Sequence, residues 1–134
     1  MKKTLLFAFS IILLFSLTAC TKEYTLTSVN VYDVLGTKLA DISSGAPEAR
    51  LTLSSGTPRD GTSVKFKYNG SYYTGIVKSG YVLWEEDPYI VKGTQHMYTI
   101  ISKDKGSICL SHHCFVGEDA IHGDYYEIKQ TFEP

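Results

Sequence analysis

The chain divides near residue 20 into one apolar run and a long region where apolar and polar positions alternate. Residues 5–15 are apolar except for Ser10, and this run is shorter than the ~20 residues that a membrane-spanning helix needs. Beyond residue 20, Val64, Phe66 and Tyr68 alternate with lysines. A period of two is typical of a half-buried β-strand. The pattern therefore predicts a short apolar leader followed by a domain of strands.

Turn signals interrupt the second region roughly every eight to twelve residues, the spacing of a small β domain. Asn69-Gly70 joins two strand-like runs and predicts a hairpin, because a type I′ turn needs positive φ at both positions. Asp104-Lys105-Gly106 separates two further runs. Residues 46–53 allow a helical turn after Pro47, although Thr and Ser weaken it. We predict an all-β fold, a small barrel or sandwich.

Composition and charge narrow the classes of protein. The 134 residues are 43% hydrophobic, with 13 basic and 14 acidic side chains. Lys2 and Lys3 belong to the leader, so the chain after residue 19 carries 11 basic and 14 acidic side chains, a formal −3. This balance excludes a polytopic membrane protein, a basic nucleic-acid binder and a long disordered chain. One small domain remains.

The leader has the features of an export signal. A basic start, Met1-Lys2-Lys3, precedes the apolar run, and Leu17-Thr18-Ala19-Cys20 follows it. That tetrapeptide resembles the bacterial lipobox. The resemblance implies that residues 1–19 are cleaved and that Cys20 carries covalent lipid, the only added group we expect. A plain signal peptide with a chance cysteine, or an uncleaved anchor, is the alternative.

The same resemblance predicts a location. Residues 20–23 form a short tether, so the domain would sit close to the membrane. Thr21 follows Cys20, where an Asp would favour retention in the inner membrane of Gram-negative bacteria. We therefore expect a lipid-anchored protein of the bacterial cell envelope, at the outer membrane and facing the periplasm where the cell has one.

Two cysteines remain after Cys20. In an exported domain an even pair favours a disulfide, so we predict one between Cys109 and Cys114. The alternative is a zinc site, because His112 and His113 lie between the two thiols. Four ligands within six residues can hardly surround one ion tetrahedrally. We therefore expect no metal.

A second resemblance covers residues 24–86, which look like a bacterial Src-homology-3-like (SH3-like) domain. Residues 28–33 resemble the opening strand of that family, residues 64–70 its central hairpin, and residues 75–82 its closing element. The resemblance implies a small barrel, with Gly in the closing element allowing strands to cross closely. Residues 87–134 fall outside it and are predicted to be a β-extension.

Aromatic residues suggest a binding surface. Tyr72, Tyr73, Tyr81 and Trp84 gather near the middle of the chain, and Tyr and Trp are favoured at interfaces. They are also common in strands for packing reasons alone. In the pair Tyr72-Tyr73, one ring must face in and the other out. We predict that the outward rings, with Trp84, line a groove for peptidoglycan or an envelope protein.

The sequence offers little for catalysis. The four histidines, at 96, 112, 113 and 122, belong to no metal or triad motif, and the acidic run 85–87 is typical of a solvated loop. We predict no catalytic residue. We favour a lipid-anchored, non-catalytic envelope binding module. An immunity, exclusion or accessory lipoprotein with one protein partner is the alternative, and a small cell-wall hydrolase ranks third.

Overall fold

The computed structural model describes residues 21–117 and 123–134. The predicted signal segment 1–19 and the predicted lipid site Cys20 lie outside the described residues, as does His122. Among the residues that are described, no helix is both long and apolar enough to cross a membrane.

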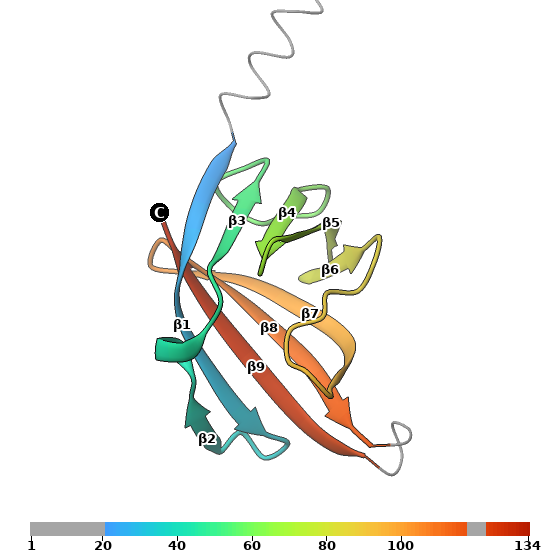
Figure 1. The fold of residues 1–134 in the computed structure, drawn as a ribbon. Helices are drawn as coiled ribbons and strands as arrows, with labels where there is room; N and C mark the ends of the chain where they lie inside the picture. The colour runs from blue at the N-terminus through green and yellow to red at the C-terminus, as the bar shows by residue number, and fades with distance from the viewer. Residues whose placement is uncertain (1–20, 118–122) are drawn as a thin grey trace, which may run out of the picture.

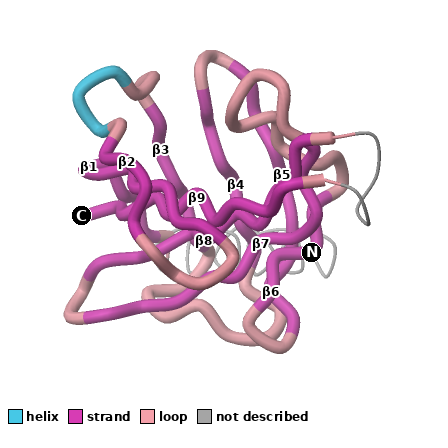
Figure 2. The backbone as a smooth tube through the Cα atoms, turned by 90° about the horizontal axis from the view of Figure 1, so that it is seen from below, coloured by secondary structure: helices cyan, strands magenta, loops and turns pink. Residues whose placement is uncertain are grey.

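The described residues form nine antiparallel strands and one 3-10 turn. The turn, η1, lies at the edge of the molecule (Figure 2). The elements are β1 (Lys22–Asp33), β2 (Lys38–Asp41), η1 (Ser43–Gly45), β3 (Ala49–Leu53), β4 (Ser63–Tyr68), β5 (Ser71–Lys78), β6 (Tyr81–Trp84), β7 (Gln95–Asp104), β8 (Ser107–Val116) and β9 (Asp124–Glu133). The all-β prediction is confirmed, and residues 49–53 form a strand rather than a helical turn.

The strands close into a barrel because β1 is long enough to pair with three neighbours. Its first residues pair with β3, most of its length pairs with β9, and its end also pairs with β2. Eight strands form the closed ring, and β2 is an additional strand outside it (Figure 1). Residues 87–134, predicted as an extension, supply β7, β8 and β9 of this same sheet.

The predicted turns occur where the sequence places them. Asn69 has φ 48° and Gly70 φ 82°, and they join β4 to β5 as a two-residue hairpin. Positive φ at both positions is the requirement of a type I′ turn. Glycine is needed at position 75 for lack of space, because a Cβ there would lie 2.7 Å from the carbonyl oxygen of Leu83. Its small size lets β5 and β6 approach, as the family resemblance implied.

The barrel interior is filled by side chains from alternate positions. Phe66 lies at its centre and contacts the rings of Tyr68, Tyr73, Trp84 and Phe132. Leu51, Leu53, Ile108 and Leu110 are fully buried around it. Burying large apolar side chains contributes about 1.5–3 kcal/mol each. The interior is therefore the main source of stability.

The barrel has two distinct ends. We call the first the N-terminal end; it holds the start of β1, the loop 54–62, and the turns 79–80 and 105–106. Two contacts join these segments: Lys103 Nζ donates to the carbonyl oxygen of Gly56 at 2.7 Å, and the Ser79 N–H donates to Asp60 Oδ1 at 2.8 Å. The far end holds the β1–β2 turn, the later part of the loop 85–94 and the start of β9 (Figure 1).

Candidate functional site

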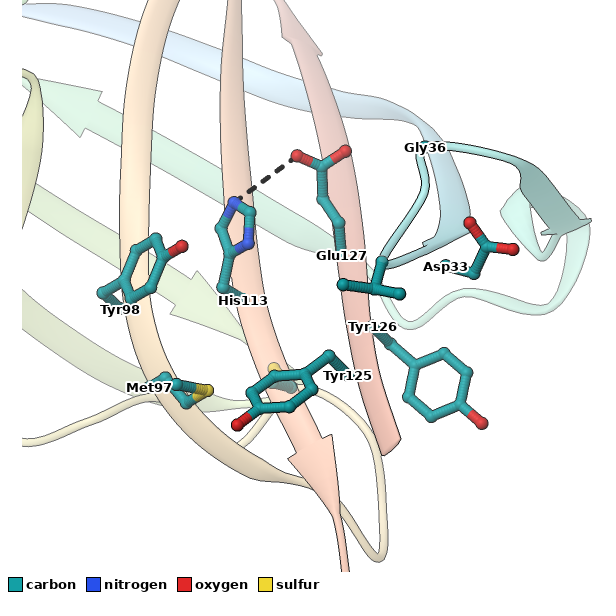
Figure 3. Close-up of a pocket in the computed structure, with 10 residues that line it drawn as sticks. Asp33, Gly36, Met97, Tyr98, His113, Tyr125, Tyr126 and Glu127 are labelled. Atoms are coloured by element: carbon teal, nitrogen blue, oxygen red, sulfur yellow. Dashed lines mark ion pairs between the residues drawn. The ribbon is translucent and has the colours of Figure 1, made fainter. Parts of the chain in front are cut away.

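A groove of about 340 Å³ lies on the barrel wall at the far end. We call it the β7–β9 groove, because most of its lining comes from those strands, with the β1–β2 turn beside them (Figure 3). Its volume falls at the lower end of the range typical of ligand sites. The lining residues are Asp33, Val34, Gly36, Met97, Tyr98, His113, Cys114, Tyr125, Tyr126 and Glu127.

Three side chains in register form the polar part of the groove. Tyr98 on β7 is paired with His113 on β8, which is paired with Glu127 on β9. Paired residues of neighbouring strands point to the same face. The Tyr98 and His113 rings stack with centroids 4.4 Å apart and planes at 16°. Tyr81 adds a further ring, packed edge-on against Tyr98 at 5.7 Å.

Glu127 is one of two carboxylates that line the groove, the other being Asp33, and its neighbours orient it. The Ser111 hydroxyl donates to Glu127 Oε2. His113 Nε2 lies 3.5 Å from the same oxygen (Figure 3). The Ser111 hydroxyl is also 3.4 Å from His113 Nε2. A serine triad uses the two nitrogens of the histidine for different partners. Here one nitrogen faces both Ser111 and Glu127, so this is not the geometry of a triad.

A second polar cluster lies inside the barrel, on the other side of β8. Thr99 and His112 are fully buried, and only 5% of the His96 side chain is exposed. The Thr99 hydroxyl lies 2.9 Å from Trp84 Nε1, 2.7 Å from His96 Nε2 and 3.0 Å from His112 Nδ1. His112 Nε2 lies 2.8 Å from Gln130 Oε1. We call these five residues the interior cluster.

Hydrogen-bond chemistry limits how the protons of the interior cluster can be arranged. Trp84 Nε1 can only donate, so it occupies one lone pair of the Thr99 hydroxyl. One proton and one lone pair of that hydroxyl remain for His96 Nε2 and His112 Nδ1. A hydroxyl has one proton and two lone pairs. Thr99 therefore uses its full hydrogen-bonding capacity.

The interior cluster favours neutral histidines. Burial lowers the pKa of His112 to about 3, against a smaller raising effect of its bond to Gln130. Burial also lowers the pKa of His96, although the nearby carboxylate of Asp87 raises it in part. His96 Nδ1 has no hydrogen-bond partner and lies 3.6 Å from Asp87 Oδ1. A charge on either ring would lack adequate solvation.

The predicted aromatic residues are divided between the interior and the surface. Tyr72 is exposed, and Lys65 and Lys67 lie over its ring at 4.8 and 5.5 Å. Tyr73 packs against Phe66 in the interior, so one ring of the pair faces in and the other out, as predicted. Trp84 also packs against Phe66 and donates to Thr99. The four predicted residues therefore do not form one groove, and only Tyr81 lies near the one we describe.

The predicted disulfide between Cys109 and Cys114 is wrong. Both are free thiols on one continuous strand, β8. Five residues of strand span about 16 Å, whereas a disulfide needs Cα atoms within about 7 Å. An odd separation also places the two side chains on opposite faces. Burial raises the pKa of the Cys114 thiol to about 11, so it is a poor nucleophile at neutral pH.

Alternation along β8 also separates the ligands of the alternative zinc site. His112 is buried inside the barrel, and His113 lies on its outer surface. Within the described ranges, no three His, Cys, Asp or Glu side chains come together as metal ligands would. The acidic run 85–87 contributes Asp87, which faces His96 as described above.

The sequence pattern did not indicate the residues that line the groove. Tyr98, Glu127 and Tyr125 come from strands that are distant in sequence, and their proximity depends on the pairing of β7, β8 and β9. The one available signal was the adjacent pair His112-His113, since neighbours on a strand face opposite sides. One of these two histidines had to be accessible if the other was buried.

Comparison of the chain with models of protein families, with curated proteins and with solved structures finds no match. The lipobox and SH3-like resemblances stay predictions.

Proposed function

We propose that the protein is a lipid-anchored, non-catalytic binding module of the bacterial cell envelope. In this proposal Cys20 carries the lipid, and the β7–β9 groove contacts peptidoglycan or an envelope protein. The observation that carries the proposal is the position of the groove. It lies at the far end of the barrel, opposite the start of β1.

The length of β1 supports this arrangement. Its twelve residues span about 40 Å at ~3.3 Å per residue, and Cys20 lies two residues before its first residue. A lipid on Cys20 would hold the N-terminal end against the membrane. The groove would then point away from the membrane, towards the cell wall.

The composition of the groove suits a saccharide-containing polymer. Tyr98 and Tyr125 are exposed and offer ring surface, which packs against the apolar faces of sugars. The Glu127 carboxylate and the His113 ring supply polar groups that fix orientation. Ser111 holds Glu127 in place, so the polar part of the groove is already ordered before a ligand arrives.

The first experiment is retention on purified peptidoglycan. We expect Tyr98→Ala and Glu127→Gln each to reduce retention about tenfold, because typical interface anchors contribute more than 1 kcal/mol. Tyr72→Ala is the matched control, since Tyr72 is an exposed tyrosine on another part of the wall. Unchanged retention of the groove variants, with an unchanged melting temperature, would refute the groove.

One observation favours the alternative, a lipoprotein with a single protein partner. The β1–β2 turn exposes two apolar side chains beside the groove, Val34 at 74% and Leu35 at 87%, and Leu39 on β2 is also exposed. Exposed apolar groups of this size often mark protein contacts. Val34→Ser with Leu35→Ser would then abolish crosslinking to one stoichiometric partner in native envelopes. The same change would leave retention on peptidoglycan intact.

A further inference from the structure

Basic side chains gather at the N-terminal end of the barrel. They come from four separate segments: the start of β1, the loop 54–62, the end of β5 and the β7–β8 turn. All five are exposed: Lys22, Arg59, Lys78, Lys103 and Lys105. The contacts of Lys103 with Gly56 and of Ser79 with Asp60 hold three of these segments together.

The acidic side chains at this end are partly engaged. They are Glu23, Asp60, Glu85, Asp104 and Glu133, with Glu48 close to Glu23. The Arg50 guanidinium lies 3.4 Å from Glu23 and 3.5 Å from Glu48, and Asp60 accepts the Ser79 N–H. On the adjoining outer face of β4, Lys65 and Lys67 are exposed, and neither is among the ion pairs of the described residues. The N-terminal end and this face together carry an excess of positive charge.

The far end has the opposite balance. Its basic side chains are Lys38 and Lys92, while its acidic ones are more numerous. The acidic residues there are Asp33, Asp41, Glu86, Asp87 and Asp124. The charge of the barrel is therefore polarised along its length, although the chain after residue 19 has a formal charge of −3.

We propose that the N-terminal end, together with the outer face of β4, docks on an anionic phospholipid surface. The proposal rests on the proposed lipid at Cys20, because that lipid would place this end at the membrane. The link from Cys20 to Lys22 spans only about 7 Å. That is within the ~8 Å over which charges act at physiological salt.

Screening explains why the net negative charge does not prevent docking. Asp33 and Asp124, near the end of β1, lie up to about 40 Å from its start by the length of that strand, which is several screening lengths from the lipid. Their repulsion by anionic headgroups is then negligible. A lysine near an anionic membrane strengthens binding about fivefold. The local positive charge of the N-terminal end therefore decides the interaction.

The test uses the mature chain, residues 20–134, with Cys20→Ser, so that no acyl chain contributes. The barrel pairings begin at Lys22 and need none of residues 1–19, and a cooperative thermal melt checks the fold. We expect co-sedimentation with vesicles of equal phosphatidylcholine and phosphatidylglycerol at low salt. We expect no co-sedimentation with pure phosphatidylcholine vesicles, and loss of binding in 0.5 M salt. Equal binding to both vesicles, or binding to neither, overturns the proposal.

Paired variants locate the surface. Lys103→Gln with Lys105→Gln should weaken binding to the anionic vesicles by about tenfold or more. Lys38→Gln with Lys92→Gln removes the same charge from the far end and should leave binding unchanged. Equal loss in both pairs would contradict a localised surface. Palmitate labelling of the wild type against Cys20→Ala tests the lipid separately, so failure of the anchor and failure of the surface are distinguishable.

Discussion

The two sides of β8 give neighbouring residues opposite chemistry. His112 lies inside the barrel with Thr99 and Gln130, fully buried, and its pKa is lowered to about 3. His113 lies on the outer surface between Tyr98 and Glu127. The two residues are identical and adjacent, so the face of the strand alone sets their roles. The inner ring is bonded on both nitrogens to buried side chains, and the outer ring is available to a ligand.

The largest expected effect comes from Thr99, which bonds to three other side chains of the interior cluster. Thr99→Val keeps the shape of the side chain but removes the hydroxyl that bonds to Trp84, His96 and His112. A buried polar group left unpaired costs about 1–3 kcal/mol, so we expect a loss of roughly 3 kcal/mol or more in the free energy of unfolding. Urea denaturation measures it.

Ser111→Ala is the matched change on the outer side of β8. It removes a hydroxyl bonded to the partly exposed Glu127, and we expect a loss of less than about 1 kcal/mol. Similar losses for Thr99→Val and Ser111→Ala would mean that the two sides are energetically alike.

Acid should lower the stability of the barrel, because it protonates His112 in the interior. The folded pKa of His112 is about 3, below its ordinary value of 6.5, so the folded protein binds fewer protons than the unfolded chain between these values. The stability that the neutral His112 contributes to the folded state is fully present above pH 6.5. It is lost as the pH falls towards 3, by about 1.4 kcal/mol per pH unit. Melting temperatures between pH 7 and pH 5 should therefore fall.

The variant His112→Gln removes the titrating ring from the interior and should flatten this dependence. His113→Gln, on the outer side, should leave the slope of melting temperature against pH close to that of the wild type. A wild-type slope that survives in His112→Gln would assign the acid sensitivity to another group.

The smallest expected effect concerns the two thiols of β8, which also lie on opposite sides of this strand. Cys114 is buried with its pKa raised to about 11, whereas Cys109 is partly exposed. We expect Cys109 to react with a thiol reagent in the native protein well before Cys114. Denaturation without a reductant should release both thiols of the Cys20→Ser chain. Detection of neither thiol after denaturation would restore the disulfide that the structure contradicts.

Local features of the fold were predictable from the sequence. The alternation of Val64, Phe66 and Tyr68 gave β4, and Asn69-Gly70 gave its hairpin, because both depend on the preferences of neighbouring residues. The same reasoning could have excluded the disulfide. The run after Asp104-Lys105-Gly106 was already expected to form a strand, and extending it to Val116 separates Cys109 from Cys114 by five strand positions.

The groove and the interior cluster depend on pairing between distant strands, which alternation does not determine. A bulge between His96 and Tyr98 shifts the register of β7. His96 and Thr99 therefore both face the interior although they are three residues apart, whereas an unbroken strand would place them on opposite faces. Nothing in the local sequence marks this bulge, so a simple period of two gives the wrong face for one of them.

The pairing of β1 with β9 has a consequence for how the protein folds. Thr25 pairs with Glu133, and Asp33 with Tyr126, so the ring closes only through contacts about a hundred residues apart in the chain. Contacts of such long range are formed slowly, and β-rich domains that depend on them fold in milliseconds to seconds. A growing chain cannot close its barrel until its last strand has been synthesised. A chain that has not yet closed its barrel is the form that the export proposed above requires, because an unfolded polypeptide can pass through a narrow channel.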